Sequence, residues 1–287
     1  MVGQDAGWAH KVAAADRTDP DLTQELATEA ELQAQAGRIN HAATLLLWAA
    51  GLSPTRVQYE HHLITAATHL CMGQAWGRAQ NLRQALQGCA PTARRDAVLG
   101  HIIVFTGEDP HTAEDLLAHA RDTAPDTATR LLAGSWLGHA LLQSADAPRA
   151  AAALRPVVDQ LPPGNTSCFA RGLLGTAASH MEPVGGLKVI AEAGLPERAS
   201  QVTSADSPLL VWRGSLRTRA GRLAAGTDDL TTVIDRQRTD PGIPPAYIEF
   251  YLLAFAYHLT GRFQDAVISA EQSLLLGLVR PIMFGAR

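Results

Sequence analysis

A hairpin pattern near the end of the chain is the feature that most constrains the fold. Residues 250–273 read FYLLAFAYHLTGRFQDAVISAEQS, with apolar residues at helical spacing on both sides of Gly261. This pattern predicts two short helices joined by a glycine turn, with small residues such as Ala266 and Ala270 where the helices approach closely. One such hairpin cannot bury its apolar side alone, so the fold needs further copies stacked against it.

Turn residues recur along the chain at a nearly constant interval. They stand at Gly37, Gly73, Gly107, residues 144–146, Gly221 and Gly261. The spacings are close to the ~34-residue unit of tetratricopeptide repeats. Between residues 145 and 221 there is room for one degenerate copy, with its second helix expected over residues 185–193. We therefore predict an all-α, tetratricopeptide-like solenoid, a right-handed superhelix of about seven hairpins over residues 1–279.

Proline positions support this register of helices. Asp19, Ser53 and Asp109 each precede a proline, which predicts a capping side chain followed by the first turn of a helix. The stretches 161–166 and 240–245 read as loops, and we expect bends in the array there. Residues 280–287 break the pattern and form an irregular tail in this reading. Because no polar capping helix follows, we expect the chain to be part of something longer.

Composition excludes several classes of protein. The chain has 46% hydrophobic but only 5% aromatic residues, which predicts a core of alanine and leucine. A net charge of −4 leaves no basic surface for direct nucleic-acid binding. No signal peptide and no membrane-spanning run is present, so we expect a cytoplasmic protein away from membranes. The three cysteines lack paired spacing and are expected to be buried, reduced thiols.

Residues that could carry chemistry do not form a convincing site. His62 and His69 fall on one helical face but two turns apart, about 10 Å by helix rise, which is too far to share one metal ion. We expect the histidines to be solvated or to cap helices. The acidic pairs 108–109, 114–115 and 228–229 are expected to be solvated, to cap helices or to lie in a first turn. We predict no metal, no cofactor and no catalytic residue, so the chain is not expected to be an enzyme.

Aromatic residues on the last hairpin suggest a binding surface instead. Tyr251, Phe255 and His258 are spaced to lie on the helix side that lines the concave groove of a solenoid. Arg219 takes a comparable place on the preceding repeat. An aromatic and cationic groove suits a peptide or a small anionic ligand. The alternative, that these residues pack against a neighbouring helix or another domain, stays open at this point.

Three segments add a family resemblance. They are HKVAAADRTDPDLTQELATEAELQAQAGRINHAATLLLWAAGLSPTR, LLVWRGSLRTRAGRLAAGTDDLTTVID and YLLAFAYHLTGRFQDAVISAEQSLLLG. Together they resemble the helical arm of LuxR-type large ATP-binding regulators of the MalT-like kind, from about His10 to Leu278. In that family an ATPase module precedes the arm and a helix-turn-helix follows it. Neither motif occurs in this sequence, and the glycine-containing stretch 184–188 lacks the spacing of a phosphate loop.

The resemblance implies a segment that senses an effector or protein partner and relays it through self-association, as part of a LuxR-family transcriptional regulator. A stand-alone scaffold that binds a partner peptide in its concave groove is the alternative. An all-α enzyme is a third reading, and the absence of converging titratable groups disfavours it.

Overall fold

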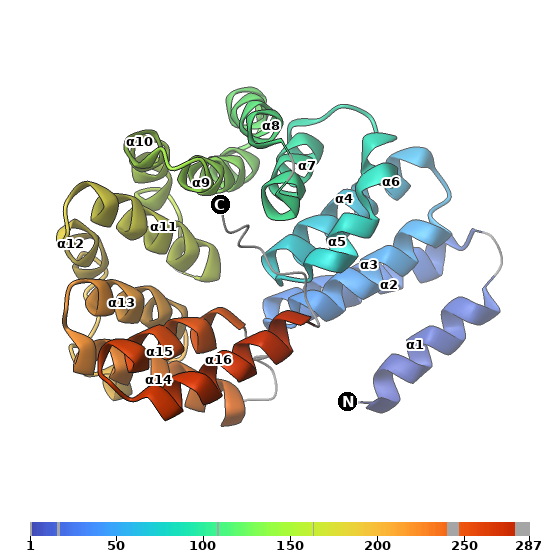
Figure 1. Ribbon diagram of the computed structural model, residues 1–287. Coiled ribbons are helices and arrows are strands. Elements are labelled where there is room, and N and C mark those ends of the chain that lie inside the picture. The colour runs from blue at the N-terminus through green and yellow to red at the C-terminus, as the bar shows by residue number, and fades with distance from the viewer. Residues whose placement is uncertain (1, 16–17, 108, 163, 240–246, 279–287) are drawn as a thin grey trace.

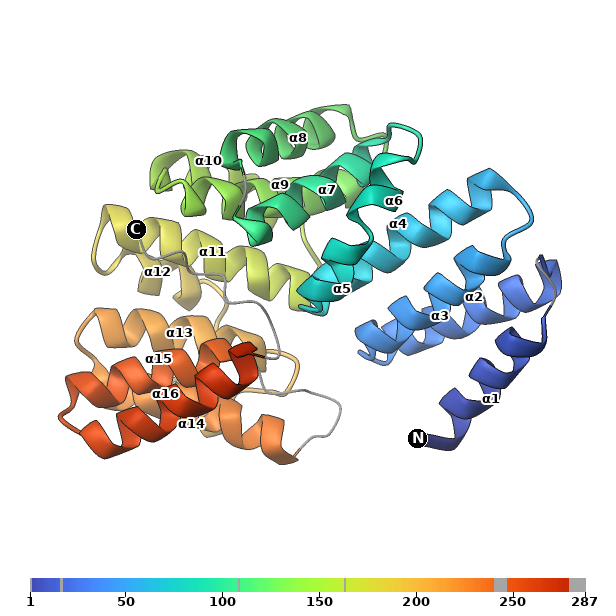
Figure 2. The same cartoon turned by 45° about the vertical axis from the view of Figure 1, so that its right-hand side comes forward.

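The protein is a curved array of paired helices. The computed structural model describes residues 2–15, 18–107, 109–162, 164–239 and 247–278. These residues form sixteen α-helices and one short 3-10 helix, with no strand among them. Each helix packs mainly against its neighbours in chain order, so that the array bends into an open arc (Figures 1 and 2). The predicted all-α solenoid of helical hairpins is confirmed.

Seven hairpins follow the N-terminal helix α1 (Val2–Ala14) within the described residues. Their first and second helices are α2 (Pro20–Gln35) with α3 (Ile39–Leu52), α4 (Arg56–Met72) with α5 (Trp76–Asn81) and α6 (Arg83–Gln87), α7 (Ala93–Thr106) with α8 (Pro110–Thr123), α9 (Thr127–Gln143) with α10 (Ala147–Val158), α11 (Asn165–Met181) with α12 (Gly185–Ala191), α13 (Ser207–Arg219) with α14 (Leu223–Thr239), and α15 (Tyr247–Leu259) with α16 (Phe263–Leu278). The 3-10 helix η1 (Ala199–Gln201) lies between α12 and α13.

Most turns inside the hairpins contain a residue in the left-handed conformation. Gly37, Gly107, Gly221 and Gly261 all have φ between 66° and 77°. Glycine adopts this conformation without the steric cost that a Cβ atom brings. In the fourth hairpin Ala145 takes this conformation with φ of 59°. The recurring turn residues of the sequence are therefore the points where the chain reverses between paired helices.

Helix starts agree with the sequence at two of three positions. The Asp19 and Asp109 side chains accept hydrogen bonds from the first-turn backbone N–H groups of α2 and α8. The expectation for Ser53 is wrong, because Ser53 ends α3 and the Thr55 side chain caps α4. A threonine two residues later offers the same acceptor to the helix.

The predicted loops are only partly described. The loop at 161–166 is shorter than expected, since α11 already begins at Asn165. The predicted loop 240–245 and tail 280–287 lie outside the described residues. Among the helices that are described, none is both long and apolar enough to cross a lipid bilayer.

Glycines inside the helices allow close packing. A Cβ atom on Gly138 of α9 would lie 2.3 Å from Cγ of Leu154 in α10. A Cβ atom on Gly186 of α12 would lie 2.4 Å from the carbonyl oxygen of Gly175 in α11. Real Cβ contacts are not this short, so these positions require glycine. The stretch 184–188 thus packs one helix against another.

A column of aromatic and imidazole rings joins five of the hairpins. Trp76 stacks on Phe105, and His101 stacks on Trp136 with ring centroids 4.1 Å apart. His139 continues the column. Its ring centroid lies 5.0 Å from that of Phe105 and 5.7 Å from that of Phe169, and the Phe169 ring in turn contacts Trp212. These contacts pass from α5 through α7, α9 and α11 to α13. Aromatic pairs add about 0.5–1.5 kcal/mol each beyond the area they bury, so the column stabilises the seam between successive hairpins.

The two histidines of this column are buried. His101 and His139 are 2% and 9% exposed, and the Nδ1 atom of each has no hydrogen-bond partner among the described residues. Burial lowers the pKa of His139 to about 4 and that of His101 well below its usual value. Both rings are therefore neutral at pH 7 in the folded chain.

Acid should destabilise the array through these rings. The unfolded chain binds protons at the ordinary histidine pKa near 6.5, whereas folded His139 binds one only near 4, so folding loses stability as pH falls through this window. From pH 7 to 5 the loss attributable to His139 is about 2 kcal/mol. Between pH 7 and pH 5, we expect the free energy of unfolding of His139→Phe to fall by about 2 kcal/mol less than that of the wild type, as measured by urea unfolding. The exposed His119→Gln should follow the wild-type curve, and an equal acid dependence in His139→Phe would contradict this account.

Candidate functional site

The predicted groove residues lie on the surface of the last two hairpins. Tyr251 and Phe255 are exposed one turn apart on α15, and His258 is exposed near the end of the same helix. Arg219 is exposed at the C-terminal end of α13. Its guanidinium lies 3.4 Å from Nε2 of His180 on α11, so its nearest described polar partner belongs to the preceding hairpin. His258 contacts the ring of Phe263 at the start of α16.

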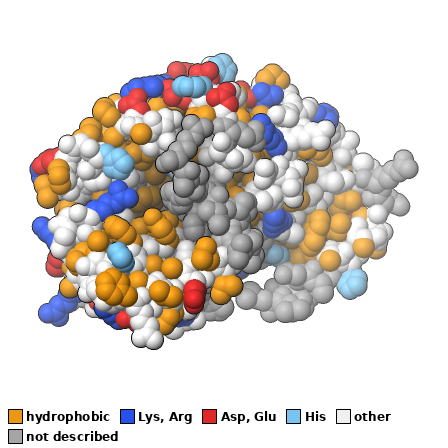
Figure 3. Space-filling model, in the orientation of Figure 1, with side chains coloured by type: hydrophobic (Ala, Val, Ile, Leu, Met, Phe, Trp, Pro, Cys, Tyr) orange, Lys and Arg blue, Asp and Glu red, His pale blue; other side chains and the backbone are white. Residues whose placement is uncertain are grey.

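A larger apolar surface surrounds these residues. Most of the exposed large apolar side chains among the described residues belong to α15 and α16, and Figure 3 shows hydrophobic side chains gathered over this part of the molecule. On α15 they are Tyr251, Phe255 and Leu259. On α16 they are Phe263, Val267, Ile268, Leu274 and Leu275, which helical spacing places on one side of the helix. We call these five residues of α16 the C-terminal apolar face.

The hairpin before it shows what is unusual about this face. Aligning the turns at Gly221 and Gly261 pairs each position of α14 with the position 40 residues later in α16. The exposed residues Asp228 and Asp235 of α14 then correspond to Ile268 and Leu275. Positions that carry charge on an inner hairpin are thus apolar on the last one. The last hairpin of any array lacks a covering neighbour, but that lack does not change which residues stand at its solvent positions. The difference between α14 and α16 is a difference in sequence.

A second part of the face matches a normal stacking contact. Ile234 of α14 is buried against Phe250 and Leu253 of α15. The corresponding residue of α16 is Leu274, which is 55% exposed. The C-terminal apolar face therefore combines the stacking position of an inner hairpin with apolar residues at its solvent positions. Exposed apolar patches of this kind mark contact surfaces for protein partners. These apolar residues are visible in the sequence, but they stand out only when the last two hairpins are aligned with each other.

One of the acidic pairs proves to be structural. The expectation that Asp229 is solvated or caps a helix is wrong, because the side chain is completely buried in α14. Its carboxylate accepts hydrogen bonds from the guanidinium groups of Arg213 and Arg217 on α13, at 2.7 to 3.2 Å. Two buried arginines require a carboxylate beside them, since an unpaired buried charge costs several kcal/mol. Asp229 thus holds a hairpin together.

The other acidic pairs are closer to expectation. Asp109 caps α8 as predicted. Glu114 lies beyond the first turn of α8, contrary to expectation, and forms an ion pair with Arg149 of the next hairpin. Such an exposed pair contributes little to stability.

The expectation for the histidines is partly wrong, whereas the expectation for the cysteines is confirmed. The expectation of solvated or capping histidines is wrong for His62, His101 and His139, which are buried. Within the described residues no group of three metal-ligating side chains comes together. Cys71, Cys89 and Cys168 are buried free thiols, as predicted. Burial raises the pKa of Cys168 to about 11, which leaves it a poor nucleophile at neutral pH.

No family model matches the chain, and no curated protein matches it.

Proposed function

We propose that the chain is a protein-binding helical-repeat segment that self-associates through the C-terminal apolar face. In this proposal it acts as the sensing and oligomerisation arm of a LuxR-family transcriptional regulator. It binds an effector or partner and performs no catalysis. The observation that carries the proposal is the replacement of Asp228 and Asp235 of α14 by Ile268 and Leu275 at the same positions of α16.

The favoured contact is a second copy of the same face. The face is apolar at both stacking and solvent positions, with one exposed carboxylate, Glu271, among its residues. An isologous contact pairs the same patch on both subunits, and it is the commonest symmetric arrangement of soluble oligomers. The α14–α15 contact within the chain shows that a helix of this array readily covers the one before it.

The regulator assignment rests on the sequence resemblance. What supports it here is the fold: a hairpin array in which each unit contacts its neighbours is suited to relay a change from a ligand to an assembly surface. Such a relay needs no ATP site and no DNA-reading helix within the array itself.

Charged substitutions in the C-terminal apolar face should disrupt the assembly. We expect the double variant Ile268→Asp, Leu275→Asp to dissociate at least about 30-fold more readily than wild type, since two central apolar contacts are each worth more than ~1 kcal/mol. Both side chains are exposed, so the hairpin should still fold. Light scattering coupled to size-exclusion chromatography measures the mass directly.

The matched control is Val57→Asp, because Val57 of α4 is also an exposed apolar residue but lies far along the chain. This variant should keep the wild-type mass. A wild-type chain that stays monomeric up to high micromolar concentration would contradict the proposal, and so would a double variant that assembles like wild type.

A stand-alone peptide-binding scaffold is the second candidate function. The exposed aromatic residues Tyr251 and Phe255 on α15, together with the exposed Arg219 at the end of α13, favour it. Peptides selected from a random displayed library should bind the wild-type chain and lose at least about tenfold in affinity to Tyr251→Ala, Arg219→Ala, because an aromatic and an arginine commonly dominate such contacts. Leu32→Ala, an exposed apolar residue of α2, is the control. Equal affinity for the double variant in fluorescence polarisation would exclude this groove.

A further inference from the structure

A cavity interrupts the array between its first two hairpins. It has a volume of about 290 Å³ and lies between α2, α3 and α4. In the middle of the array the first helices of successive hairpins pack directly on one another, as α7 does on α9, α9 on α11 and α11 on α13. The helices α2 and α4 make little direct contact by comparison. The cavity occupies the space that this missing contact leaves.

The residues of this seam explain the gap. Ala27, Ala30 and Ala34 face the cavity from α2, and Leu46 of α3 lines it as well. Along the later hairpins the ring column described above fills the seam between first helices. Alanines cannot bridge the same distance, so an apolar space remains. Clefts of about 300 Å³ are at the small end of the range for ligand sites.

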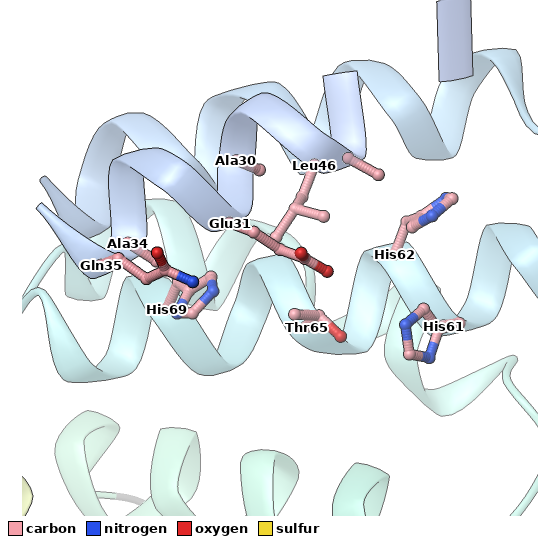
Figure 4. A pocket seen from close by; sticks show the side chains of 10 residues that line it. Ala30, Glu31, Ala34, Gln35, Leu46, His61, His62, Thr65 and His69 are labelled. Carbon is pink, nitrogen blue, oxygen red and sulfur yellow. The ribbon is translucent and has the colours of Figure 1, made fainter. Parts of the chain in front are cut away.

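Polar side chains converge on one side of this space. Figure 4 shows Glu31 extending from α2 toward Thr65 on α4, with His69 a turn further along α4 beneath Gln35. Thr65 Oγ1 and His69 Nδ1 are buried and have no hydrogen-bond partner among the described residues. A buried polar atom without a partner costs about 1–3 kcal/mol, so both atoms favour a polar ligand group beside them.

The charge of the cavity has one sign. Glu31 contributes the only acidic side chain among the described lining residues, and no basic lysine or arginine lines the space. Burial lowers the pKa of His62 and of His69, with smaller contributions from His61 and Arg94 respectively, so both rings are neutral at pH 7. Arg94 of α7 has its own opposite charge in Asp126. His62 Nδ1 already lies 3.0 Å from Ser53 Oγ, and the His61 ring is exposed, whereas His69 Nδ1 is buried without a partner among the described residues.

We propose that this cavity binds a small primary amine as its ammonium ion. An ammonium group has three donors, and the cavity offers three acceptors: the Glu31 carboxylate, the Thr65 hydroxyl and His69 Nδ1 in its Nε2-protonated tautomer. The short aliphatic chain of the amine packs on the alanines of α2. The neutral, alanine-lined part disfavours a second charge, so the ligand is a monocation rather than a polyamine.

This inference goes beyond the proposed function and does not depend on it. The cavity belongs to the first two hairpins, whereas the C-terminal apolar face belongs to the last. Binding is measured on the full chain by titration with n-butylamine at pH 7, followed by chemical-shift changes of the ¹³C-methyl groups of threonine and leucine. Self-association is read separately from the molecular mass.

We expect saturable shifts with n-butylamine and none with butyrate or 1-butanol at the same concentrations. Glu31→Gln should weaken binding at least about tenfold, and Thr65→Val severalfold, because charge-assisted and neutral hydrogen bonds differ in strength by roughly a factor of two. Glu29→Gln is the matched control, since Glu29 lies on the same helix and accepts a hydrogen bond from Gln33. It should bind n-butylamine as wild type does.

Three outcomes would overturn the proposal. They are no saturable binding of n-butylamine, unchanged affinity in Glu31→Gln, and an equal loss in Glu29→Gln. Nα-acetyl-lysine amide tests whether a peptide-borne ammonium is the true ligand. Weaker binding than n-butylamine supports the small amine, whereas tighter binding would contradict it.

Discussion

Burial of each hairpin by the next is the interaction on which this structure depends. A pair of helices has an apolar side that it cannot cover, and in this chain the following pair covers it. The ring column makes this cover specific. His101 on Trp136 and His139 on Phe169 are contacts between different hairpins, so the seam holds only when the hairpins stack in register.

Two places depart from this rule, and both carry the functional proposals. Between α2 and α4 the seam is lined by alanine and small polar groups, which leaves a cavity with unpaired acceptors. On α16 the apolar side has no described helix over it, and Ile268 and Leu275 extend it onto positions that are charged on α14. Between these two places, neighbouring helices are held together by the ring column, by close contacts at glycines and by the buried Arg213–Asp229–Arg217 cluster. These inner hairpins separate the cavity from α16 along the chain.

Much of the fold could be predicted from the sequence because its signals are local. A glycine or small polar residue at the turn, followed by apolar residues at helical spacing, identifies six hairpins, and the degenerate one inferred from the remaining space has its second helix where expected. The chemistry of single side chains was less predictable. Asp229 and His139 look like ordinary surface residues until the helix that covers them is known. The cavity is still harder, since it arises from what Ala30 and Ala34 fail to fill, and only the spacing of α2 and α4 reveals it.

Amide hydrogen exchange along the full chain tests the central claim most directly. If each hairpin is stabilised by the cover of its neighbours, amides of α9 and α11 should exchange slowest. Those of α16 should exchange fastest in dilute solution and become protected as protein concentration rises. Uniform protection along the array, or an α16 as slow as α9 at every concentration, would contradict the account.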